Sequence, residues 1–245
     1  MASLRTALLA PALVLMTAAA AAESPVASRE PVVLLHGLAR TSASMRPLEA
    51  ALLADGHPVC NIDYPSRAHD IATLAREHIA PRIRQCFPGH AGPVQFVTHS
   101  MGGIVVRRLA QDHLVRVGRV VMLGPPNQGS EVIDYLGDTR VFRRIAGPAA
   151  QELHTGRAPA APAGFELGVL AGRRSLNPWL SLLIPGPDDG KVSVARARLA
   201  GMRDFRVLDT SHPLILRDPE AIRQTLQFLD HGRFTGPALA QADAS

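Results

Sequence analysis

Residues 98–103 read THSMGG and follow a short apolar run, at the point where a stretch with helical spacing begins. A serine at such a strand-to-helix junction sits in a sharp turn that pushes its hydroxyl out of the sheet. The two backbones come close there, so small residues are needed around the serine. Gly102 and Gly103 meet this need, whereas Thr98 stands where the G-x-S-x-G pattern has its first glycine. We therefore predict that Ser100 is an exposed nucleophile, against the alternative of an ordinary Ser-Gly helix cap.

Short apolar runs of the same kind recur along the chain and alternate with amphipathic stretches. Runs that are apolar on successive residues are typical of strands buried on both faces. The alternation predicts an α/β fold with a mostly parallel six-stranded sheet and helices on both faces, whose ligand site lies at the carboxyl ends of the strands. The expected strands are 31–36, 57–64, 94–99, 118–124, 165–171 and 204–208, and the expected helices are 44–55, 68–86, 102–114 and 218–231.

The acid and the base of a nucleophilic site are expected after the later strands, in the order Ser, Asp, His. The sequence offers PDDGKV at 187–192 and SHP further on, which contains His212. His212 is the predicted base. Asp189 is the predicted acid because it directly precedes a glycine turn, and Asp188 is the alternative.

Two backbone N–H groups are the expected donors to the oxyanion of a reaction intermediate. One follows the nucleophile and belongs to Met101, and the other lies in the loop after the first strand and belongs to Leu38. His36, in the same loop, is expected to order the loop rather than to transfer protons. His99, beside the serine, is expected to be a packing residue.

The N-terminus has the order of a secretory signal peptide: Arg5, an apolar stretch, then alanines before Glu23. We expect a signal peptide over 1–22, with an uncleaved anchor as the alternative, and a protein exported to the periplasm or the extracellular space. One domain then covers 23–235, followed by a flexible tail, 236–245.

Residues 125–164 fit the strand-helix alternation poorly. They contain two consecutive prolines, one short helical stretch and an Ala/Pro-rich region. A small cap over the pocket and a plain surface excursion are equally compatible with this composition.

Composition argues against nucleic-acid binding. The net charge is +5, but only Lys191 is a lysine, and the arginines are scattered, in runs no longer than two. The two cysteines, Cys60 and Cys86, are a disulfide candidate in an exported protein. Neither has another cysteine or a histidine at metal-ligand spacing, so we do not expect them to bind a metal. We predict no metal and no cofactor.

The chain resembles bacterial lipases and esterases of the α/β-hydrolase superfamily, from about Pro31 to Phe234. The resemblance is carried by VVLLHG, THSMGG, DDGKVSV and TSHPLIL, in that order, and by LGPPNQGS, which is similar to the lipase segment G-T-P-H-x-G-S with Asn127 in place of its histidine. The resemblance implies an α/β-hydrolase fold, with Ser100 as nucleophile, Asp189 as acid and His212 as base. It also implies an oxyanion hole at Leu38 and Met101, and it maps no calcium site.

These observations lead us to expect a secreted serine hydrolase that cleaves small-molecule or lipid carboxylic esters through an acyl-enzyme. An acyltransferase or thioesterase with the same residues is the nearest alternative, and a non-catalytic binding module on the same fold is a more distant one. Only 88 residues separate Ser100 from Asp189, so a large lid is not expected. Transient contact with a membrane surface is a further expectation, and the oligomeric state is left open.

Overall fold

The computed structural model describes residues 29–157 and 164–236. The expected signal peptide, 1–22, and all but the first residue of the expected tail, 236–245, lie outside the described residues. Among the helices of the described ranges, none is both long enough and apolar enough to cross a membrane.

Six strands form one sheet in the order β2-β1-β3-β4-β5-β6. Every neighbouring pair is parallel. The prediction of six mostly parallel strands is therefore confirmed, and each predicted run overlaps one strand. The strands are β1 (Val32–Leu35), β2 (Val59–Ile62), β3 (Val94–His99), β4 (Val117–Leu123), β5 (Leu167–Gly172) and β6 (Asp204–Leu208).

Both faces of the sheet are covered, which explains the uninterrupted apolar runs. Side chains alternate between the faces of a strand, and in β1 Val33 and Leu35 enter one apolar core while Val32 and Leu34 enter the other. All four are fully buried. Apolar side chains are consequently required at successive positions.

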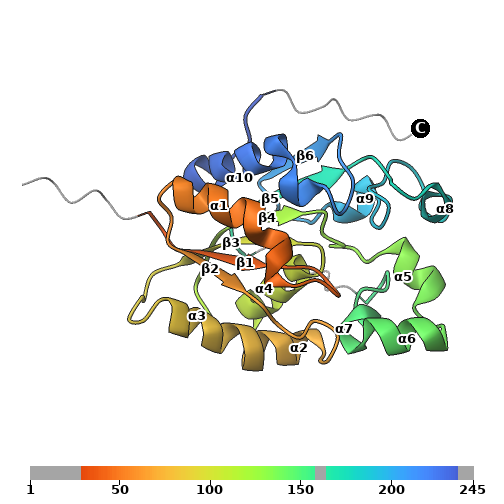
Figure 1. Ribbon diagram of the computed structural model, residues 1–245, viewed down its shortest axis with the longest axis horizontal. Helices are drawn as coiled ribbons and strands as arrows, with labels where there is room; N and C mark the ends of the chain where they lie inside the picture. Colours follow the sequence, from red (N-terminus) through yellow and green to blue (C-terminus); the bar gives the residue numbers. More distant parts are fainter. Residues whose placement is uncertain (1–28, 158–163, 237–245) are drawn as a thin grey trace, which may run out of the picture.

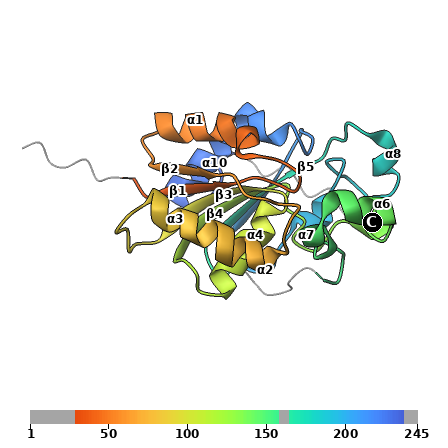
Figure 2. The same ribbon diagram turned by 60° about the horizontal axis from the view of Figure 1, so that its bottom comes forward.

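Helices form a layer on each side of the sheet (Figures 1 and 2). The predicted helix over 68–86 is built from two α-helices joined by a π-helical segment, Leu74–Ile79. On one face lie α1 (Arg46–Ala54) and α10 (Pro219–His231); on the other lie α2 (Ile71–Thr73), α3 (Ala80–Cys86) and α4 (Gly102–Gln111). Shorter elements are α9 (Val194–Ala197) and the 3-10 turns Ser42–Met45 and Ile215–Arg217.

The segment that follows β4 forms three short helices beyond one end of the sheet, where α8 also lies (Figure 1). They are α5 (Glu131–Leu136), α6 (Arg140–Ala146) and α7 (Pro148–Gln151), and α8 spans Pro178–Ser181. Side chains of α5 and α6 line a pocket. The small cap predicted over 125–164 stays a prediction, because residues 158–163 lie outside the described residues. Below, the cap denotes α5, α6 and α7.

A disulfide joins Cys60 of β2 to Cys86 at the end of α3, with their Cα atoms 6.0 Å apart. β2 is an edge strand of the sheet. The bond therefore ties this edge to the helical segment that follows it in the chain.

Candidate active site

Ser100 lies in the turn between β3 and α4 with a φ of 52°. This left-handed conformation costs a non-glycine residue about 1–3 kcal/mol and persists only where neighbouring structure enforces it. Here the Ser100 N–H donates to the Leu123 carbonyl at 2.9 Å, and the Ser100 carbonyl accepts from the Gly103 N–H at 3.0 Å. A Cβ on Gly102 would lie 2.6 Å from the Leu35 carbonyl oxygen. The turn thus requires the glycine that the sequence provides.

Thr98 takes the place of the first glycine of the pattern without opening the turn. Its side chain is fully buried in β3, between Leu35 of β1 and Met122 of β4. The Thr98 hydroxyl has no hydrogen-bond partner among the described residues. The departure from glycine therefore places a buried hydroxyl next to the turn that contains Ser100.

His212 and Asp189 are in direct contact. The His212 Nδ1–H donates to Asp189 Oδ2 at 2.7 Å, and both side chains are buried. The other carboxylate oxygen, Oδ1, accepts from the backbone N–H groups of Lys191 at 3.0 Å and Val192 at 2.9 Å. The His212 N–H donates to the Asp189 carbonyl at 2.9 Å. With Nδ1 occupied, a neutral His212 carries its free lone pair on Nε2.

Asp188 serves a different purpose. Its carboxylate accepts from the Ser181 hydroxyl at 2.9 Å and from the Gly190 N–H at 2.7 Å. It therefore holds the loop between α8 and α9, while its neighbour Asp189 faces His212.

Two glycines that the sequence analysis did not single out lie against Asp189 and His212, the predicted acid and base. Gly124 has a φ of +55°, and a Cβ there would come 2.9 Å from Asp189 Oδ2 and 3.2 Å from His212 Nδ1. A Cβ on Gly172 would come 2.9 Å from the Asp189 Cβ. Gly124 directly follows β4 and Gly172 is the last residue of β5. Both therefore lie at the carboxyl ends of the strands, where a ligand site is expected, and this position is the signal that could have identified them.

His99 is more than the packing residue expected from the sequence. Its Nε2–H donates to the His212 carbonyl at 2.9 Å. Burial, with smaller effects from the charges of His212, Arg40 and Lys191, holds the pKa of His99 well below its usual value. A neutral ring that donates through Nε2 has an unprotonated Nδ1, which has no hydrogen-bond partner among the described residues. His99 therefore positions the backbone of the predicted base.

The loop after β1 lies close against the serine. A Cβ on Gly37 would be 3.1 Å from the Ser100 Cβ. Neither the Leu38 nor the Met101 N–H, the two predicted oxyanion donors, is used in a hydrogen bond to another described residue. These two N–H groups therefore remain available to a ligand.

His36 orders this loop. Its ring stacks on Tyr64 with centroids 4.0 Å apart, and its Nδ1–H donates to the Gly37 carbonyl at 2.9 Å. Its Nε2 accepts from the Tyr64 N–H at 3.3 Å, and the Tyr64 hydroxyl donates to the His36 carbonyl. Burial lowers the pKa of His36, which favours the neutral ring that this pattern needs.

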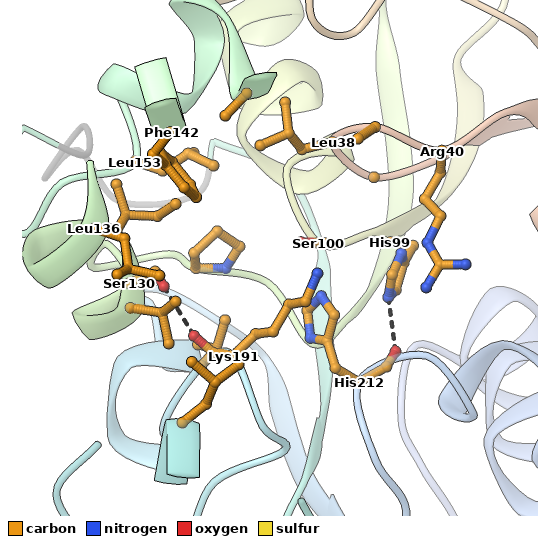
Figure 3. A pocket seen from close by; sticks show the side chains of 18 of the residues that line it. Leu38, Arg40, His99, Ser100, Ser130, Leu136, Phe142, Leu153, Lys191 and His212 are labelled. Atoms are coloured by element: carbon orange, nitrogen blue, oxygen red, sulfur yellow. Dashed lines mark hydrogen bonds between the residues drawn. The ribbon is translucent and has the colours of Figure 1, made fainter. Parts of the chain in front are cut away.

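A pocket of about 310 Å³ opens beside Ser100 and His212 (Figure 3). One side is apolar and comes mainly from the cap. The other side contains the first loop, His99 and two cationic side chains. The lining residues are Gly37, Leu38, Ala39, Arg40, His99, Ser100, Pro126, Ser130, Val132, Ile133, Leu136, Phe142, Ile145, Ala146, Leu153, Leu180, Lys191, Val192 and His212.

Asn127, which replaces the histidine of the lipase segment, is a buried structural residue outside the pocket lining. Its side-chain amide donates to the Ala197 carbonyl at 2.9 Å, and its own carbonyl accepts from Arg107 at 3.0 Å. The same segment is fastened to the acid loop where the Ser130 hydroxyl donates to the Lys191 carbonyl at 2.8 Å. Asn127 therefore fixes the base of the cap and does not contact a ligand in the pocket.

One cluster in the described ranges has the composition of a metal site. Asp55, His57 and Asp230 bring ligand atoms within 4.8 Å of one another. Arg29 already lies among them, 2.8 Å from Asp55 and in contact with Asp230 and His57. The guanidinium thus supplies the positive charge that this cluster needs, and the prediction of no metal stands as a prediction.

Comparisons with known proteins bear on the family and the fold of the chain. Residues 32–226 match the model of the alpha/beta hydrolase family. A triacylglycerol lipase of Burkholderia plantarii is 30% identical over 129 residues, which span 49% of this chain and 36% of the lipase. The chain thus corresponds to about a third of that relative's length.

Solved structures share the fold at low sequence identity. The mature form of Bacillus licheniformis lipase BlEst2 has a TM-score of 0.70 at 22% identity, covering 84% of this chain and 94% of that one. The metagenomic carboxyl esterase MGS0156 has a TM-score of 0.62 at 19% identity, covering 77% and 66%. Since the family model extends over most of the sequence and the sheet has the matching architecture, the chain belongs to the alpha/beta hydrolase family.

Proposed function

We propose that the protein hydrolyses carboxylic esters through an acyl-enzyme on Ser100. One observation carries the proposal: the 2.7 Å hydrogen bond between His212 and Asp189, next to a serine in a positive-φ turn at the wall of an apolar pocket. A serine hydroxyl is activated by a base beside it, and the base is held in turn by an acid on its far side. The similarity to a triacylglycerol lipase supports an ester as the substrate class.

In the proposed reaction His212 Nε2 removes the hydroxyl proton as Ser100 Oγ attacks the ester carbonyl carbon. The tetrahedral oxyanion accepts hydrogen bonds from the Leu38 and Met101 N–H groups, and each such donor contributes about 100- to 1,000-fold to the rate. The carbon–oxygen bond to the leaving alcohol then breaks, and His212 returns its proton to that oxygen. His212 then takes a proton from water as the water oxygen attacks the acyl-serine carbonyl. The bond between the acyl carbon and Ser100 Oγ breaks, His212 returns the proton to Oγ, and the carboxylic acid is released. Asp189 holds the imidazole in the required tautomer throughout.

The acyl chain is proposed to occupy the cap side of the pocket. The walls there are Val132, Ile133 and Leu136 of α5, with Phe142 of α6 and Leu153. Such apolar walls favour a hydrocarbon chain over a charged acyl group.

Exposed apolar side chains on the cap, on α8 and directly after α8 support contact with a lipid phase. Tyr135, Val141, Ile145, Trp179 and Leu182 are each more than half exposed, and Trp179 reaches 79%. Concentrated apolar exposure of this kind is typical of interaction surfaces. Transient membrane-surface contact near the pocket is therefore part of the proposal.

Export to the periplasm or the extracellular space is also proposed. The N-terminal sequence pattern supports it, as does the Cys60–Cys86 disulfide, since such bonds persist in oxidising compartments. Intact mass of the protein recovered from its native host tests the expected cleavage near Ala22.

Fluorophosphonate labelling tests the activated serine without a guess at the substrate. Purified protein is treated with the reagent and compared with Ser100→Ala by intact mass. A single adduct on the wild type and none on the variant is expected, followed by a chain-length series of esters. A folded wild type that remains unlabelled would contradict the proposal and favour a binding module. Adding an alcohol during turnover and analysing products then separates hydrolysis from acyl transfer.

A further inference from the structure

Two cationic side chains line the pocket beside Ser100. Arg40 comes from the loop after β1, and Lys191 follows Asp189 in the acid loop. Figure 3 shows the Lys191 side chain running alongside the His212 ring toward Ser100, while Arg40 lies beside His99. The two cations therefore approach the reacting position from different loops.

Neither cation is neutralised by a direct partner. Among the described residues, no carboxylate forms an ion pair with Arg40 or Lys191, and neither side chain donates a hydrogen bond. The pocket lining contains no aspartate or glutamate. Asp189 is the nearby acid, but His212 and two backbone N–H groups already use both of its oxygens.

The surroundings of Lys191 disfavour its positive charge, and a bound anion would stabilise that charge. Partial removal of water by the surrounding protein, and then the charge of Arg40, lower the pKa of Lys191, while Asp189 opposes the shift. His99, which lies between the two cations, is held neutral. On its polar side, the described part of the pocket thus has two positive charges without an acidic partner. On its cap side, it is lined by hydrocarbon.

Lys191 is also the single lysine of a chain with 26 basic residues. Arginine presents a planar fork, whereas lysine places a compact ammonium with three donors at the end of a flexible stem. The flexible stem lets this ammonium reach an anion beside a bound ester, and both side chains are good donors to phosphate or carboxylate oxygens.

We infer that Arg40 and Lys191 form an anion subsite that binds a phosphate or carboxylate group on the alcohol portion of the ester. The inference deepens the proposed function and rests on it: the acyl chain enters the cap side, the carbonyl lies at Ser100, and the acidic leaving group faces the two cations. The shared chemistry is an anionic oxygen group, supplied either by a lipid headgroup or by a soluble acidic ester.

The test compares two esters that differ only in the anion, 1-hexanoylglycerol and 1-hexanoylglycerol 3-phosphate, by chromatography of released hexanoic acid. The wild type is expected to prefer the phosphorylated ester in kcat/KM. In Lys191→Gln and in Arg40→Gln this preference ratio should fall roughly ten- to hundredfold, the effect of losing a hydrogen bond to a charged group. Arg84→Gln removes the same charge from an exposed position on α3 outside the pocket, and it should keep the ratio.

The inference is overturned if the wild type shows no preference, or if the ratio survives both pocket substitutions. It is also overturned if Arg84→Gln lowers the ratio as much, because general charge attraction would then explain it. Vesicles of phosphatidylglycerol identify the source of the anion. If the wild type hydrolyses the vesicles faster than the monomeric phosphate ester, and Lys191→Gln loses this difference, the anion belongs to a lipid headgroup. If the monomeric ester is hydrolysed faster, the anion belongs to a soluble ester.

A binding measurement separates failure of the inference from failure of the proposed function. Titration calorimetry of Ser100→Ala with hexyl phosphate and with hexanol requires no turnover. Binding of hexyl phosphate alone, weakened at least tenfold by adding Lys191→Gln, supports the subsite even if fluorophosphonate labelling fails. Successful labelling with equal binding of both compounds refutes the subsite and leaves ester hydrolysis standing.

Discussion

Replacement of Asp189 by asparagine changes a single atom and should nearly abolish activity. In the structure, Asp189 Oδ1 accepts from two backbone N–H groups at 2.9 and 3.0 Å, while Oδ2 accepts from His212 Nδ1 at 2.7 Å. An asparagine must turn its only oxygen toward the two backbone donors. Its NH2 group then faces Nδ1, which can accept only if the His212 proton moves to Nε2.

This tautomer cannot take a proton from Ser100, because Nε2 is then already protonated. The corresponding substitution in a well-studied serine protease lowers kcat by about 10⁴-fold with the geometry intact, and we expect a loss of that order for Asp189→Asn. The fold should persist, since the variant keeps both backbone hydrogen bonds and introduces no charge.

Asp188→Asn is the matched control. The single carboxylate oxygen of Asp188 that accepts from Ser181 and Gly190 can be replaced by an amide oxygen, so its loss in kcat should stay below about tenfold, the effect of weakening one charge-assisted bond. Initial rates with p-nitrophenyl butyrate and fluorophosphonate labelling rates are measured for both variants, with circular dichroism as a check on folding. Near-normal activity in Asp189→Asn, or a larger loss in Asp188→Asn, would refute the assignment of the acid.

Three further changes test the surroundings of the site. Gly124→Ala should lower the unfolding free energy by about 1–3 kcal/mol and reduce kcat, because it strains a positive φ and brings Cβ within 2.9 Å of the Asp189 carboxylate; urea melts and initial rates measure the two effects. Replacing both cysteines with alanine removes a cross-link over 26 residues, which should cost about 3.5 kcal/mol from loop entropy, and an unchanged urea midpoint would contradict this. Because the pKa of His99 is depressed in the folded state, the unfolded chain binds the extra proton, so stability should be full above pH ~6.5 and fall by up to about 1.4 kcal/mol per pH unit below it. His99→Gln should flatten this acid-side slope in urea titrations at pH 7.5 to 4.5, and an identical slope in wild type and variant would count against a neutral His99.

Several parts of this architecture could be predicted from the sequence because they depend on local patterns. Strands buried on both faces need uninterrupted apolar runs, and helices that cover them need amphipathic spacing, so six strands and the main helices were located in order. The π-helical segment within 71–86 could not be located in this way, because it is a short insertion in a stretch that the amphipathic pattern predicts as one continuous helix.

The side-chain partners in the site depend on contacts between distant segments. Asp188 and Asp189 are chemically alike and adjacent, and the choice between them follows from the direction in which the loop turns each carboxylate. His99 contacts the carbonyl of a residue 113 positions away. In the sequence, Gly124 and Gly172 are ordinary glycines at strand ends. Their contacts with Asp189 are formed only when β4, β5 and the loop that contains Asp189 pack together.

The sequence by itself determined the strand order along the chain and the position of the serine turn, because these follow from periodicity and from glycines at fixed offsets. Its motifs also carried the resemblance to the family. Only the tertiary structure decided which carboxylate contacts His212, that side chains of α5 and α6 line a pocket, and that Arg40 and Lys191 line that pocket without a direct acidic partner among the described residues. The physical reason is that hydrogen-bond direction, burial and charge pairing are set by loops packed from different parts of the chain, and no local pattern encodes their meeting.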